Sequence, residues 1–218
     1  MPRPATNLSL YVITDRLLAG GRPLVQIVDQ AIQGGATCIQ VREKDMSTRD
    51  LYLLSLQLRE LTRERNVSLI INDRLDIALA VEADGVHLGQ DDLPAKVAGR
   101  VIPPDMILGV SAENVRQALE AQKSGASYLG VGAIYATSTK LDAGEPIGLK
   151  TLSDICKAVD IPVVGIGGIH AGNARHVIEA GAQGVAVISC ILAAEQVVEA
   201  AGEVVRQIHE VLNVQGRL

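Results

Sequence analysis

The 218-residue sequence predicts a single-domain (β/α)8 TIM barrel over residues 1–218, and two observations carry this prediction. Eight short apolar segments alternate with amphipathic helical stretches, and parallel strands need long crossovers of this kind. In addition, one helix-to-strand joint recurs, in which a small residue ends the helix and Gly-Ala follows, at 33–36, 123–126 and 179–182. Eight such units fit a closed barrel, and a doubly wound open sheet is the weaker alternative.

The strands are expected over eight segments that are short, apolar and rich in Val, Ile and Leu: 8–14, 36–43, 67–72, 85–89, 107–111, 128–134, 162–167 and 184–189. Helical periodicity fills the gaps between them and is clearest in 48–65, 112–124, 172–180 and 195–212. No linker, low-complexity segment or shift in composition divides the chain, so we expect one domain.

Composition and charge exclude several function classes. The net charge of −5 argues against nucleic acid as a partner, and the absence of Trp and Phe leaves no aromatic platform for stacking bases. No apolar run is long enough to span a membrane, and the start of the chain does not resemble a signal peptide. Cys38, Cys156 and Cys190 are widely spaced and odd in number, so we expect reduced thiols in a cytoplasmic protein. The sequence leaves open whether the protein forms a homo-oligomer.

The end of the second predicted strand carries a row of polar side chains. Because side chains alternate along a strand, Gln40, Arg42 and Lys44 share one face, and Val41 and Glu43 lie on the other. Two cations and an amide in one row suit an anionic ligand that is rich in oxygen. The alternative is a charged strand tip in solvent.

In a barrel of this kind, functional groups lie at the carboxyl ends of the strands, so the residues that follow each strand matter most. These positions hold polar groups and glycines that complement one another: Asn72, Asp73, Asp91, Asp92, Ser111, Thr137, Ser138, Thr139, Lys140, Gly167, Gly168, Ile188 and Ser189.

Asp73 and Asp92 follow neighbouring strands and could share a divalent cation, since Mg²⁺ commonly takes one or two protein carboxylates together with phosphate oxygens and water. The alternative for both is a helix N-cap, and spacing alone does not choose between Asp91 and Asp92. Arg42, Lys44 and Lys140 would surround that metal as a clamp for a diphosphate leaving group. Schiff-base chemistry at a lysine is less favoured, because Lys44 and Lys140 lie in strongly polar strings.

A second phosphate site is predicted where the glycines of 165–168 meet Ile188 and Ser189, the usual phosphate position of such barrels. His87 lies inside a predicted strand and is interpreted as a packed, hydrogen-bonded core residue. No Ser–His–Asp or Cys–His arrangement and no histidine pair with metal-ligand spacing is evident, so the candidate site has cations, amides and a metal but no proton-transfer pair.

The chain resembles the thiamine-phosphate synthase family along nearly its whole length. The resemblance rests on eight ordered strings: 10–15 (LYVITD), 40–44 (QVREK), 71–73 (IND), 86–92 (VHLGQDD), 109–111 (GVS), 137–140 (TSTK), 164–169 (VGIGGI) and 187–189 (VIS). One departure is that Ala133 and Ala136 stand where the family often has proline, which makes that loop less pre-set.

The resemblance implies a TIM-barrel enzyme that joins a hydroxymethylpyrimidine diphosphate to a thiazole phosphate with Mg²⁺ and releases pyrophosphate. Arg42, Lys44, Ser111 and Lys140 are then the expected catalytic residues, and Asp73 and Asp92 the expected metal ligands. The expected substrate-binding residues are Gln40, Val41, Arg42, Glu43, Lys44, Asn72, Ser111, Thr137, Ser138, Thr139, Lys140, Gly168, Ile188 and Ser189.

Two rival interpretations stay open. One is the thiazole tautomerase-like branch of the same family, against which the intact Arg42, Lys44, Asp73, Asp92 and Lys140 argue. The other is a non-catalytic barrel that senses a ligand, because folds outlive activities. A sugar-phosphate isomerase or epimerase would need a catalytic base that the sequence does not offer.

Overall fold

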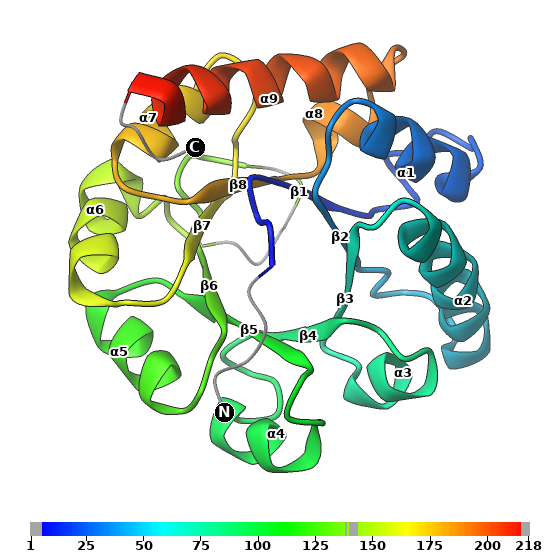
Figure 1. Cartoon of the computed structure of the whole chain (residues 1–218), viewed down its shortest axis with the longest axis horizontal. Helices are drawn as coiled ribbons and strands as arrows, with labels where there is room; N and C mark the ends of the chain where they lie inside the picture. Colours follow the sequence, from blue (N-terminus) through cyan, green and yellow to red (C-terminus); the bar gives the residue numbers. More distant parts are fainter. Residues whose placement is uncertain (1–5, 138, 140–143, 215–218) are drawn as a thin grey trace.

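The computed structural model describes residues 6–137, 139 and 144–214, which form a closed parallel barrel inside a ring of helices (Figure 1). Each strand pairs in parallel with the next one in the chain, and the last pairs with the first. The predicted (β/α)8 barrel is therefore confirmed. The strands are β1 Leu10–Ile13, β2 Cys38–Val41, β3 Ser68–Asn72, β4 Gly85–Leu88, β5 Ile107–Ala112, β6 Tyr128–Val131, β7 Val163–Ile166 and β8 Gly184–Val187.

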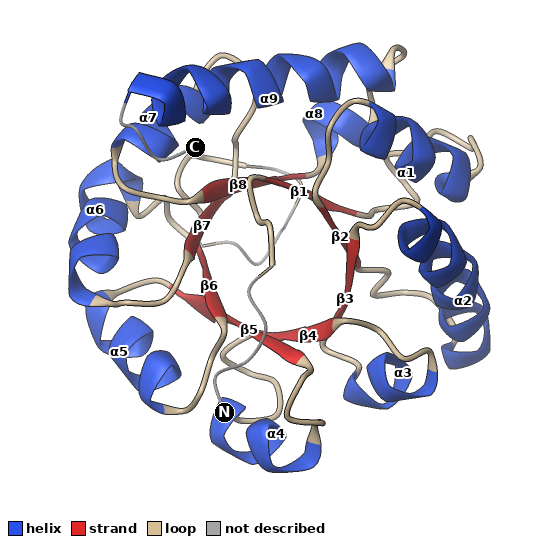
Figure 2. Ribbon diagram, in the orientation of Figure 1, coloured by secondary structure: helices blue, strands red, loops and turns tan. Residues whose placement is uncertain are grey.

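The helices surround the strands, as Figure 2 shows. In the described part of the chain they are α1 Leu24–Gln33, α2 Thr48–Glu64, α3 Leu75–Ala80, α4 Ala95–Val101, α5 Val115–Lys123, α6 Gly148–Ala158, α7 Ala174–Glu179, α8 Ser189–Leu192 and α9 Val197–Val214. The short α8 directly follows β8, and the long α9 then packs against α1 and α7. All four clearest helical predictions fall on observed helices.

Several predicted boundaries differ from the observed ones, and two of the differences have a clear physical cause. The strand expected over 128–134 ends at Val131, because Ile134 N–H and Tyr135 N–H turn to the carbonyls at the end of β7. The helix expected from 112 begins at Val115, since Ala112 still pairs with Val131 in the sheet. Asn114 then caps the helix, as its side chain accepts a hydrogen bond from Gln117 N–H at 3.0 Å.

The recurrent joint between helix and strand has a common backbone geometry. Gly35, Gly125 and Gly181 each follow the helix C-cap with φ values of 105°, 90° and 113°. Side chains rarely tolerate this left-handed region, so glycine is the residue that lets the chain leave the helix and enter the next strand.

The core has two layers. Between strands and helices lies the large aliphatic layer, to which outward strand residues such as Val12, Val41 and Leu129 belong. Inward side chains fill the barrel itself: Leu8, Tyr11, Ile13, Cys38, Ile70, Ile107, Tyr128, Val164 and Ala186. Leu8 lies before β1, in the segment that crosses one end of the barrel in Figure 1, and so closes the end where the strands begin.

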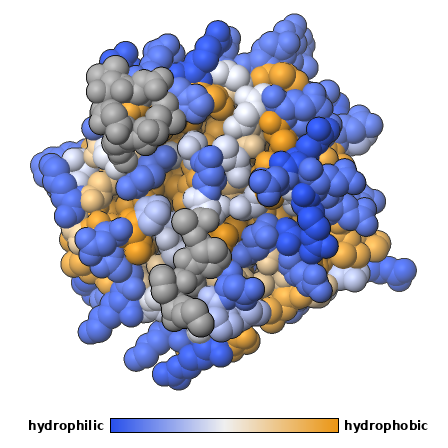
Figure 3. Space-filling model, in the orientation of Figure 1, coloured by the Kyte–Doolittle hydropathy of each residue, from blue (hydrophilic) through white to orange (hydrophobic). Residues whose placement is uncertain are grey.

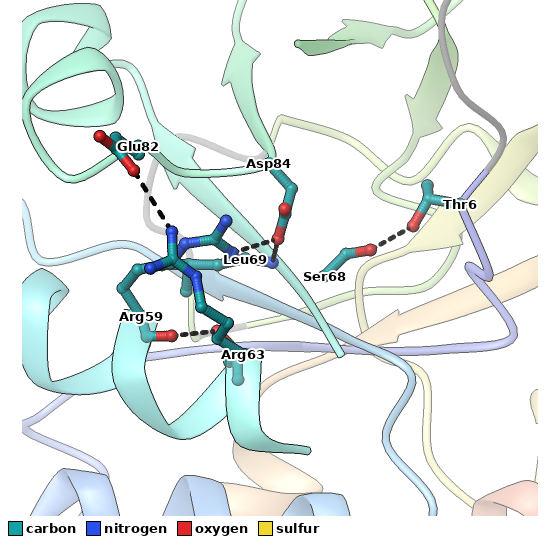
Figure 4. A network of polar contacts seen from close by, with 8 residues as sticks. Thr6, Arg59, Arg63, Ser68, Leu69, Glu82 and Asp84 are labelled. Carbon is teal, nitrogen blue, oxygen red and sulfur yellow. Dashed lines mark hydrogen bonds and ion pairs between the residues drawn. The ribbon is translucent and has the colours of Figure 1, made fainter. Parts of the chain in front are cut away.

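Polar contacts tie the elements together at that closed end (Figure 4). Asp84 precedes β4, and its Oδ2 accepts hydrogen bonds from Arg59 Nη1 of α2 and from Leu69 N–H of β3, both at 2.7 Å. Arg63 and Glu82 form a second ion pair nearby at 3.3 Å, with both side chains mostly exposed. The Asp84 pair is more buried and also satisfies a backbone group, so we assign the greater stabilisation to it.

We expect Asp84→Ala to lower the free energy of unfolding by about 2 kcal/mol, because it leaves Arg59 and Leu69 N–H without their acceptor. Urea unfolding followed by circular dichroism measures the change. Glu82→Ala is the matched control and should cost less than about 1 kcal/mol. Equal losses in the two variants would contradict this account.

Hydrophilic side chains dominate the rim of the face seen in Figure 3, with apolar residues showing between them. In the described ranges, no helix combines the length and the apolar character that a membrane crossing requires.

Candidate functional site

A cavity of about 710 Å³ opens at the carboxyl ends of the strands, and residues in or just after all eight strands line it. Most of the residues that the sequence singled out meet here. They are Gln40, Arg42, Lys44, Asn72, Asp73, Asp92, Ser111, Thr137, Thr139, Gly168, Ile188 and Ser189. Groups separated by up to about 150 positions in the chain thus share one mouth of the barrel.

Four other predicted residues are not among these lining residues. Ser138 and Lys140 lie outside the described residues. Val41 is 1% exposed and packs outward in the layer between strands and helices, so its side chain does not line the cavity. Glu43 is buried away from the cavity, and its Oε2 accepts a hydrogen bond from Arg16 N–H at 3.1 Å, which holds the loop after β1.

The alternation expected at the end of β2 is present, because Gln40, Arg42 and Lys44 all line the cavity. Thr14, which is fully buried, holds this strand end from the side. Its N–H donates to the Gln40 carbonyl at 2.8 Å, and its hydroxyl accepts from Arg42 N–H at 3.0 Å. The backbone positions of Gln40 and Arg42 are therefore fixed by their contacts with Thr14, the residue that follows β1.

Asp73 and Asp92 follow the neighbouring strands β3 and β4, and their side chains meet at the mouth. Burial, a hydrogen bond with Asp92 and the charge of Asp92 raise the pKa of Asp73 to about 6, although Lys44 and Arg42 oppose this shift. Asp92 Oδ2 also accepts a hydrogen bond from Gly89 N–H at 2.6 Å, which orients it.

The helix-cap interpretation of these acids does not hold. Arg74 precedes α3 and Pro94 precedes α4, and neither helix has a side-chain cap. Asp73 instead adopts a left-handed backbone with φ of 59°, and its N–H donates to the His87 carbonyl at 2.9 Å. The backbone thus turns at Asp73 where its carboxylate reaches Asp92.

The two carboxylates could hold a divalent cation. Their mutual repulsion would be relieved by a positive charge between them, and oxygen donors suit Mg²⁺. Within 6–137, 139 and 144–214, no group of three or more His, Cys, Asp or Glu side chains could hold a metal. An ion at this site would therefore complete its coordination with water or ligand oxygens, as Mg²⁺ commonly does.

The opposite side of the mouth offers backbone groups and hydroxyls. Gly167 and Gly168 have φ values of 100° and 64°, and a Cβ on Gly168 would lie 2.6 Å from the Ala136 carbonyl oxygen. Asn173 holds this turn, because its Nδ2 donates to the Gly168 carbonyl and its Oδ1 accepts from His170 N–H, both at 2.9 Å. Only glycine fits such a turn, and it leaves the backbone open to a ligand.

Tyr11 and Tyr128, which lie beneath the cavity, were not predicted from the sequence. Tyr11, Tyr128 and His87 point into the barrel and hydrogen-bond to one another and to Gln40 and Ser111. His87 is buried and hydrogen-bonded, as expected, but it also lines the cavity together with Tyr11. The available signal was alternation, which places Tyr11 on the inward face between Leu10 and Val12.

Comparisons with known proteins point to one family. The family model described as "Thiamine monophosphate synthase" matches residues 10–191. The thiamine-phosphate synthase of Moorella thermoacetica is 54% identical over 203 residues, which cover 93% of this chain and 95% of that protein. That of Clostridium novyi is 51% identical over 186 residues, covering 85% and 91%. The solved structure of thiamine phosphate pyrophosphorylase from Pyrococcus furiosus superposes with a TM-score of 0.88 at 47% identity, covering 95% and 98%.

Proposed function

Because the chain belongs to the thiamine-phosphate synthase family, we propose that its cavity joins an aminopyrimidine diphosphate to a thiazole phosphate, with thiamine phosphate and pyrophosphate as products. The single observation that carries this assignment is that Arg42, Lys44, Asp73 and Asp92 line one cavity together with the Gly167–Gly168 turn. The mouth of the barrel can therefore bind a diphosphate group next to a monophosphate group.

The diphosphate end is formed by the charged side. Arg42 and Lys44 donate to phosphate oxygens and neutralise the charge that grows as the diphosphate departs. Asn72 and Ser111 add neutral donors, and Lys140 joins them by its place in the family motif. Gln40 lies deeper in the barrel and meets the pyrimidine ring.

The thiazole phosphate binds on the glycine side. Thr137 and Thr139 offer hydroxyls and Gly168 an open backbone, while Ile188 and Ser189 lie where α8 begins. Ser138 belongs to the same string in the sequence. These groups hold the thiazole so that its ring nitrogen faces the methylene carbon of the pyrimidine.

The reaction matches the groups available. The bond between the methylene carbon and the diphosphate oxygen breaks, the ring amine stabilises the resulting cation, and the thiazole nitrogen forms the new bond with its lone pair. That nitrogen carries no proton, so the nucleophile requires no base. What remains is to stabilise the leaving group and to align two substrates, which is what cations and fixed backbone groups do.

We further propose Mg²⁺ as the cofactor, held by Asp73 and Asp92, where it would neutralise the diphosphate when bound. We also propose a cytoplasmic protein with small molecules as its partners, without nucleic acid or membrane. Cys38 and Cys190 are free thiols, which supports a reducing compartment. The tautomerase-like alternative is not favoured, since the charged side of the cavity is intact.

The direct test incubates the protein with both substrates and Mg²⁺. We expect thiamine phosphate and pyrophosphate in equal amounts, measured by chromatography and ³¹P NMR, and no product when either substrate is left out. If both substrates bind and no product forms, the proposed function is overturned.

A further inference from the structure

A continuous chain of hydrogen bonds crosses the barrel interior beneath the cavity. Gln40 Nε2 donates to the Tyr11 hydroxyl at 2.7 Å, and that hydroxyl lies 2.8 Å from the hydroxyl of Tyr128. The Tyr128 hydroxyl lies 2.9 Å from His87 Nδ1, and His87 Nε2 lies 3.0 Å from Ser111 Oγ. The chain links five strands, and both of its ends, Gln40 and Ser111, line the cavity.

The barrel makes room for this chain with two glycines. A Cβ on Gly109 would lie 2.3 Å from the Tyr128 hydroxyl oxygen and 2.5 Å from His87 Nδ1, and one on Gly130 would lie 2.9 Å from His87 Cε1. Tyr11 and Tyr128 are buried and meet edge to face, with ring centroids 5.9 Å apart. The rings therefore fill the space of two absent side chains, and packing holds them in place.

One direction of proton donation satisfies every link of the chain. The Gln40 amide nitrogen can only donate, so the Tyr11 oxygen accepts and its own proton goes to Tyr128. In that direction Tyr128 gives its single proton to His87 Nδ1, and the imidazole carries its proton on Nε2. Burial raises the pKa of both tyrosines well above the ordinary value, so the phenols keep these protons.

The last link decides what Ser111 can do. In the same direction His87 Nε2–H donates to Ser111 Oγ, so the serine oxygen accepts and its own proton can point to a ligand. At the other end, Gln40 uses one N–H on Tyr11, and its Oε1 remains as an acceptor. The two ends of the chain thus carry opposite hydrogen-bonding polarity.

We propose that Tyr11, Tyr128 and His87 are positioning residues that fix this polarity, so that Ser111 donates into the cavity and Gln40 accepts. The proposal rests on the proposed function, in which the diphosphate oxygens only accept hydrogen bonds and the ring amino group donates them. The chain therefore matches both ends of one substrate. A pyrimidine with a carbonyl oxygen in place of the amino group would face Gln40 Oε1 with a second acceptor and bind poorly.

The kinetic test uses Tyr128→Phe and Tyr11→Phe, which keep the rings and remove one link each. We expect kcat/KM for the pyrimidine diphosphate to fall about tenfold and KM for the thiazole phosphate to stay within about twofold. Preference for the amino over the carbonyl analogue should fall by a similar factor. Tyr52→Phe on α2 removes a hydroxyl outside the barrel and serves as the matched control. Unchanged kinetics and preference in both variants would overturn the proposal.

A second measurement does not depend on turnover. ¹⁵N NMR of the histidine-labelled protein should show His87 as the neutral Nε2–H tautomer, assigned by its loss in His87→Gln, and a mixture of tautomers in Tyr128→Phe. The Nδ1–H tautomer in the unsubstituted protein, or an unchanged tautomer in Tyr128→Phe, would overturn the proposed chain. If the condensation itself fails, this spectrum still decides the direction of the hydrogen bonds.

Discussion

Arg42→Ala is expected to reduce kcat/KM with the pyrimidine diphosphate by about a thousandfold while the barrel stays folded. Removing one positioned charge from a developing anion commonly costs a factor of about 100 to 1,000 in rate. The backbone contact between Arg42 N–H and Thr14 does not need the side chain, so alanine retains it. Steady-state kinetics with saturating thiazole phosphate measures the loss, and circular dichroism checks the fold.

Arg74→Ala is the matched control. Arg74 also carries a positive charge at the mouth, one residue after Asp73, but it pairs with Asp76 at 2.6 Å and does not line the cavity. We expect its kcat/KM to stay within about threefold of the unsubstituted value, since exposed pairs contribute little. Arg42→Lys should fall between the two, because lysine keeps the charge but not the paired donors. Equal losses in Arg42→Ala and Arg74→Ala would contradict a specific role for Arg42.

The barrel and much of its mouth could be predicted because their rules are local. Alternation along one strand is enough to place Gln40, Arg42 and Lys44 on the inward face, and repeated Gly-Ala joints reveal the βα units. The same rule puts Val41 and Glu43 outward. Both were expected among the substrate-binding residues because they belong to the contiguous motif 40–44, and their side chains do not line the cavity.

What could not be predicted depends on contacts between distant parts of the chain. Tyr11 and Tyr128 are 117 positions apart, and only barrel closure brings their hydroxyls together. Spacing likewise could not choose between Asp91 and Asp92. Both acids line the cavity, and Asp92 is the proposed ligand because it hydrogen-bonds Gly89 N–H and contacts Asp73.

Asp73→Asn is expected to raise the stability of the metal-free protein at pH 7 by about 1–2 kcal/mol and to remove its stabilisation by Mg²⁺. In the folded protein the Asp73 carboxyl has a pKa of about 6, whereas its ordinary value, expected in the unfolded chain, is 3.8. The raised pKa therefore favours folding below pH 4, and this contribution is lost as the pH rises through 6. Because the Asp73 carboxyl is partly exposed, we expect its pKa shift to change the free energy of unfolding by less than the full shift would give.

Thermal unfolding at pH 4.5 to 7.5, with and without Mg²⁺, measures both effects. As the pH rises, the unsubstituted protein should lose stability relative to Asp73→Asn, and Mg²⁺ should restore it only where both Asp73 and Asp92 are present.

Asp91→Asn is the matched control and should keep the response to Mg²⁺, because it is Asp92, and not Asp91, that contacts Asp73. Asp73→Asn and Asp92→Ala should both lose turnover. An equal Mg²⁺ response in Asp73→Asn and the unsubstituted protein would mean that the metal binds elsewhere, and the pair of acids would then need another explanation.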